Sequence, residues 1–125
     1  MITPIANRAL FVALLALVAP AHAERIQADL KCSFTGIDFV YDCVIRLQPP
    51  KSGVRISVGA DMPSMPGAHT VQPVMAKPGK LAGEYYARLD LEMPGEWAVK
   101  LRLSGALRDD LVLNYVFPET DDRPR

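Results

Sequence analysis

The chain has 125 residues, and its 14 basic and 14 acidic side chains leave no net charge at pH 7. Nucleic-acid binding depends on a basic surface that neutralises phosphates, so this balance argues against a nucleic-acid partner. A chain of this length forms one domain with a single hydrophobic core.

The first 23 residues have the three parts of a secretory signal peptide. Arg8 supplies the positive charge, residues 9–19 form an apolar run of 11 residues, and Ala21-His22-Ala23 fits the cleavage rule. The run is well below the roughly 20 apolar residues that a membrane-spanning helix needs. We therefore expect export to the periplasm, cleavage after Ala23 and no membrane span in the mature chain. An uncleaved membrane anchor is the alternative.

Cleavage would remove 23 of the 125 residues and leave 102, enough for one folded domain at residues 24–118. We expect the short charged segment after it, residues 119–125, to be disordered.

Apolar and polar residues alternate through seven segments of the mature chain, as in strands that turn one face toward a core. The segments are residues 25–34, 39–48, 54–60, 70–76, 85–91, 97–103 and 111–117. Pro73 interrupts the fourth and places it at a sheet edge, because proline donates no ladder hydrogen bond. Turn residues separate the segments, and none has helical periodicity. The pattern predicts an all-β fold, an immunoglobulin-like seven-stranded β-sandwich, with an open barrel as the alternative.

If each strand crosses the sandwich once, the connections alternate between its two ends. The first, third and fifth connections, at residues 35–38, 61–69 and 93–96, then share one end. The side chains that this arrangement brings toward one rim are Met62, Met65, His69 and Met93.

The two cysteines, Cys32 and Cys43, both fall on inward-facing positions of their strands. A hairpin that turns at Ile37 and Asp38 pairs residues whose numbers sum to 75, which sets the cysteines directly opposite one another. Opposite Cβ atoms lie roughly 4.5–5.5 Å apart, close to bridging distance. In an exported chain this predicts a disulfide. Two free thiols or a dithiolate metal site are the alternatives.

The segment Met-Pro-Ser-Met-Pro-Gly-Ala-His at residues 62–69 is the one unusual set of metal ligands. Thioether sulfur is a soft ligand and imidazole a borderline one, and together they suit Cu(I). We therefore treat Met62, Met65 and His69 as a candidate Cu(I) site, with Met93 as an optional further sulfur. In the structural alternative Met62 continues the inward register of residues 54–60 and caps the core, Met65 covers the sandwich end, and His69 is solvated.

An enzymatic function is not expected. His69 is the sole histidine of the mature chain, so a histidine pair for catalytic zinc is absent. Ser64 precedes it by five residues, but nothing places a carboxylate behind the imidazole as a catalytic triad requires.

Several short motifs follow one another in a recognisable order between residues 39 and 117. They are the Met-Pro loop with His69, then Gly-Glu-Tyr at residues 83–85, then Met-Pro-Gly-Glu-Trp at residues 93–97 before an alternating strand. This order resembles the YtkA-like/FixH-like domain family. The resemblance implies an exported or membrane-anchored immunoglobulin-like domain associated with copper handling and cytochrome oxidase assembly. It places the family's Met/His loop on Met62, Met65 and His69, and its turn methionine on Met93.

The chain departs from the family in two respects. FixH proteins keep an N-terminal membrane helix, whereas we expect residues 1–23 to be removed, and relatives often have more than one histidine in the loop. Cys32 and Cys43 are not part of the family pattern. We expect a periplasmic Cu(I)-binding or chaperone-like protein that serves a periplasmic or membrane protein client. The alternative is a non-enzymatic interaction module without metal, in which the methionine-rich rim is an apolar contact surface.

Overall fold

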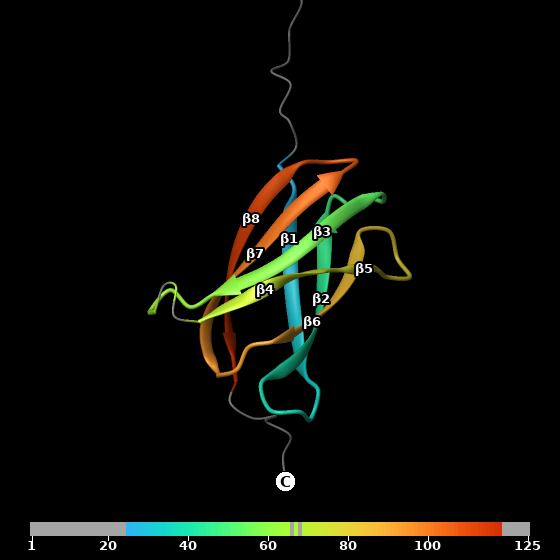
Figure 1. The fold of residues 1–125 in the computed structure, drawn as a ribbon. Helices are drawn as coiled ribbons and strands as arrows, with labels where there is room; N and C mark the ends of the chain where they lie inside the picture. The colour runs from blue at the N-terminus through green and yellow to red at the C-terminus, as the bar shows by residue number, and fades with distance from the viewer. Residues whose placement is uncertain (1–24, 66, 68, 119–125) are drawn as a thin grey trace, which may run out of the picture.

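The computed structural model describes residues 25–65, 67 and 69–118 as two four-stranded antiparallel sheets (Figure 1). One sheet has the order β1-β2-β6-β5 and the other the order β4-β3-β7-β8. The strands are β1 (Gln27–Phe34), β2 (Val40–Gln48), β3 (Val54–Asp61), β4 (Thr70–Met75), β5 (Lys77–Pro78), β6 (Glu84–Asp90), β7 (Gly95–Gly105) and β8 (Asp109–Phe117). The predicted signal peptide and the predicted disordered tail lie outside the described residues.

The all-β prediction is confirmed, but the predicted number of seven strands is wrong. The eighth strand is β5, whose two residues pair with Tyr86 and Tyr85 of β6. β5 lies between the fourth and fifth predicted strands, in a segment that we expected to be a turn. Two residues are too few to produce an alternating pattern. No helix able to cross a membrane occurs in the part of the chain that the structure describes.

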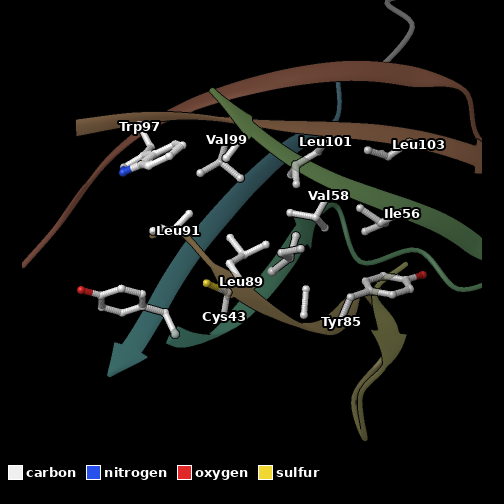
Figure 2. Packing of buried hydrophobic residues seen from close by; sticks show 14 of the residues in the cluster. Cys43, Ile56, Val58, Tyr85, Leu89, Leu91, Trp97, Val99, Leu101 and Leu103 are labelled. Atoms are coloured by element: carbon white, nitrogen blue, oxygen red, sulfur yellow. The ribbon is translucent and has the colours of Figure 1, made fainter. Parts of the chain in front are cut away.

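The core lies between the two sheets and takes alternate residues from the central strands. Figure 2 shows Trp97, Val99, Leu101 and Leu103 of β7 in a row that faces Leu89 and Leu91 across the interior. Full burial of each large apolar side chain contributes about 1.5–3 kcal/mol. Trp97 is 1% exposed and is one of the largest side chains in this layer. The predicted inward faces of β2, β3, β6 and β7 are therefore confirmed, apart from Phe39.

Phe39 was expected to begin the inward face of the second strand, and this expectation is wrong. Its φ of 62° places it in the left-handed region, within the turn that precedes β2. The backbone carbonyl of Phe39 accepts a hydrogen bond from the Leu91 N–H at 3.0 Å. The end of β6 is thereby tied to the first hairpin turn.

The predicted disulfide between Cys32 and Cys43 is present. Every pair in the β1–β2 ladder sums to 75, from Gln27 opposite Gln48 to Phe34 opposite Tyr41. The two cysteines face each other directly, with their Cα atoms 4.0 Å apart. Cys43 is fully buried, and Cys32 is half-buried on the edge strand. Free thiols and a dithiolate metal site are excluded for this bridged form.

Reduction of this disulfide should lower the free energy of unfolding by about 2–3 kcal/mol, because the bridge closes a short loop in the unfolded chain. The sequence separation of the two cysteines is 11 residues. Urea denaturation with and without a thiol reductant, followed by the fluorescence of Trp97, measures the difference. A Cys32→Ala/Cys43→Ala variant that is insensitive to the reductant is the control. Equal stability of the reduced and oxidised forms would contradict the expectation.

Candidate metal centre

The connection between β3 and β4 holds three of the four candidate ligands. The Met62 N–H donates to the His69 carbonyl at 3.4 Å, which continues the pairing of β3 and β4 beyond Asp61 and Thr70. The Met65 N–H donates to the Met62 carbonyl at 3.1 Å and closes a turn inside the connection. These two hydrogen bonds hold the backbones of Met62, Met65 and His69 in one closed loop.

Met62 belongs to the hydrophobic core. Its side chain is 6% exposed and continues the inward series of β3, as the structural alternative predicted. Its methyl carbon lies 3.4 Å from the position that a Cβ atom on Gly95 would occupy. Met62 therefore reaches the turn between β6 and β7, and the third and fifth connections meet at one end of the sandwich.

Met65 and His69 are more open to solvent than Met62. Met65 is 38% exposed, and His69 is half-buried. Met65 and His69 are therefore the more accessible of the three candidate ligands in this connection.

Met93 lies in the turn that Met62 approaches. It is half-buried and packs against the core. Its carbonyl accepts a hydrogen bond of 3.2 Å from the indole Nε1 of Trp97. This bond fixes the Met93 backbone relative to the central core residue, so Met93 is positioned by the fold rather than left on a free loop.

The candidate ligands that the described residues offer at this end are thioether sulfurs and one imidazole. No three His, Cys, Asp or Glu side chains of the described ranges come together as a group able to hold a metal ion. Both cysteines of the chain are joined in the disulfide.

Glu84 is a buried carboxylate that the sequence interpretation did not single out. It is 7% exposed, accepts a hydrogen bond from the Tyr86 hydroxyl and pairs with Arg46, whose Nε lies 3.6 Å from its Oε2. The hydrogen bond to Glu84 raises the pKa of Tyr86. A Cβ atom on Gly79 would stand 2.7 Å from Glu84 Oε1, so a larger residue there would force the side chains of Glu84 and Tyr86 to shift. The cluster is a satisfied structural network with no unpaired acid.

A shallow groove of about 420 Å³ crosses the outer face of the second sheet. Its charged side chains already have partners, because Lys100 pairs with Asp61 and Arg102 Nε lies 3.4 Å from Asp110 Oδ1. The groove therefore presents no uncompensated charge to a ligand.

Comparison of the chain with protein-family models, with curated proteins and with solved structures finds no match. The YtkA-like/FixH-like resemblance rests on the sequence motifs alone and stays a prediction.

The different burial of the two loop methionines predicts different effects on stability. Met62→Ala should lower the free energy of unfolding by about 2–5 kcal/mol, because it leaves a cavity beneath Gly95. Met65→Ala should change it by less than about 0.5 kcal/mol, because the side chain is partly solvated. Urea denaturation checks both variants, with the exposed Met75→Ala as the matched control. Equal losses for Met62→Ala and Met65→Ala would contradict the assignment of Met62 to the core.

Proposed function

We propose that the protein is a periplasmic copper-handling protein that binds Cu(I), or passes it on, through Met62, Met65 and His69. Met93 is an additional sulfur ligand in this proposal. The protein is exported by cleavage after Ala23 and has no enzymatic activity. Its two sheets form an immunoglobulin-like sandwich of the YtkA-like/FixH-like kind.

The observation that carries the proposal is the closure of the loop by the two backbone hydrogen bonds from Met62 and Met65. One joins Met62 to His69 at 3.4 Å, and the other joins Met65 to Met62 at 3.1 Å. The two thioethers and the imidazole therefore all extend from one short, closed segment. Less conformational entropy is then lost when these side chains converge on an ion. Met62 also approaches the turn that contains Met93, which supports Met93 as the further sulfur ligand.

The disulfide supports thioethers as the copper ligands. Oxidation has joined Cys32 to Cys43, which leaves no thiolate in the described structure to compete for a soft ion. Thioethers have no proton to lose and do not form disulfides, so they remain ligands where thiols are oxidised. The chemistry of the loop thus suits the compartment that the signal sequence predicts.

Each ligand has a separate role in this mechanism. Met65 and His69, which are accessible, make the first contacts with Cu(I). Met62 supplies a sulfur that the core holds in place, and Met93 completes the site from the neighbouring turn. A site of neutral, weakly basic ligands with an accessible side suits transfer of the ion to a client, such as a membrane oxidase during its assembly.

The exposure of Met65 favours a second candidate function. A 38% exposed methionine on a rim is also an adaptable apolar contact for a protein partner. In this alternative the protein is a metal-free interaction module that docks on a periplasmic or membrane complex. Copper binding separates the two functions.

A Cu(I) competition titration with the oxidised protein tests the proposal. The Met62→Leu/Met65→Leu variant should lose most of its Cu(I) affinity, because leucine has no sulfur. Its free energy of unfolding should change by less than about 1.5 kcal/mol, because apolar volume is nearly conserved. His69→Ala should weaken binding and reduce its pH dependence, since imidazole coordinates only when neutral.

Met75→Leu is the matched control, because Met75 is an exposed methionine of β4 outside the loop. It should bind Cu(I) as the parent protein does. Parent-like binding by the Met62→Leu/Met65→Leu variant would contradict the metal function at this loop and leave the interaction module as the explanation.

A further inference from the structure

The two sheets have four edge strands, and three of them carry features that prevent pairing with another chain. β1 presents Asp29 and Lys31 to solvent. β4 contains Pro73 and a register irregularity against β3, and β5 has only two residues, one of which is Pro78. Charges, proline, bulges and short length are the usual means by which edge strands avoid association.

The fourth edge strand, β8, has none of these features over most of its length. Residues 111–117, Leu-Val-Leu-Asn-Tyr-Val-Phe, contain no charge, no proline and no glycine. β8 lies at the end of its sheet beside β7 (Figure 1). In the described part of the chain its backbone–backbone hydrogen bonds go to β7 alone. The other side of β8 is a free template for a further strand.

Several side chains of β8 are also left exposed or only half-buried. On the outer face, Val112 is 62% exposed and Val116 is 69% exposed. On the inner face, Leu111, Leu113 and Tyr115 are only half-buried, although they pack against the core. Two valines this exposed on one face of an uncharged edge strand are typical of an interaction surface.

The sequence of β8 is complementary to itself around Asn114. In an antiparallel pairing of two copies centred on this residue, Val112 of each copy faces Val116 of the other. Leu113 faces Tyr115 on the inner side, and the two Asn114 amides face each other and can exchange hydrogen bonds. Because no residue of this stretch is charged, the pairing opposes no like charges. A twofold interface requires this kind of self-complementarity.

We propose that the protein forms a homodimer through antiparallel pairing of β8 with β8 of a second copy. The pairing joins the two β4-β3-β7-β8 sheets into one continuous sheet. The interface uses the edge of the sheet opposite to β4, whereas the candidate copper loop follows β3 and leads into β4. The dimer therefore does not use the loop of residues 62–69, although the turn that contains Met93 lies beside the C-terminal end of β8, where Gly95 pairs with Phe117.

Sedimentation equilibrium of the purified protein, with a charge-reversal pair of variants, tests this interface. The parent protein should have the mass of two chains at about 100 μM, which corresponds to a dissociation constant well below that concentration. Val112→Lys/Val116→Lys places like charges opposite each other in both halves of the interface, and should raise the dissociation constant at least about tenfold. Val112→Lys/Val116→Glu places opposite charges there, and should restore much of the affinity.

Both substitutions fall on exposed positions, so circular dichroism and the intact disulfide should show that each variant folds. Met75→Lys, an exposed apolar residue on β4, is the control and should leave the dimer unchanged. A parent protein that is monomeric at about 1 mM would overturn the proposal. So would a Val112→Lys/Val116→Lys variant that dimerises like the parent, or a Val112→Lys/Val116→Glu variant no tighter than the double lysine. A dimer weakened by Met75→Lys would mean that the contact lies on another surface, and this result would also overturn the proposal.

Discussion

The packing of one apolar layer against another across the two sheets is the interaction on which the rest of the structure depends. Strand geometry sends every second residue inward, so each central strand contributes a row of buried side chains. Trp97 fills much of the space at one end of this layer and also holds the Met93 carbonyl through its indole N–H. The same packing that stabilises the fold therefore fixes the position of the turn beside the candidate metal loop.

Met62 shows how this constraint reaches the candidate site. It is the residue at which the inward series of β3 continues into the loop, and it is 6% exposed. A neutral thioether can be buried without the large desolvation cost that a charged ligand would have. The structure shows that Met62 stabilises the core. The proposed function gives the same side chain a second role as a sulfur ligand, which its lack of charge permits.

Local alternation was sufficient to predict most of the strands, their inward faces and the register that joins Cys32 to Cys43. Alternation was insufficient where a strand is very short or where a contact joins residues far apart in the chain. The two residues of β5 are too few to show an alternating pattern. Phe39 does not follow the alternation of its segment because its backbone has a left-handed conformation in a turn. The hydrogen bond from the Cys32 N–H to the Tyr115 hydroxyl, at 3.1 Å, joins residues 83 apart in the chain. The meeting of Met62 with the turn at Gly95, by contrast, agrees with the alternation of connections between the two ends, which placed residues 61–69 and 93–96 together.

The central claim is that a methionine loop anchored in the core binds Cu(I). The most direct test is NMR of the protein with labelled methionine methyl groups during a Cu(I) titration. Cu(I) is diamagnetic, so each methyl signal stays observable as the ion is added. The account predicts that the Met62 and Met65 signals shift together and saturate at one equivalent, while the exposed Met75 signal does not move. A shift confined to Met75, or no shift of Met62 at saturating Cu(I), would contradict it.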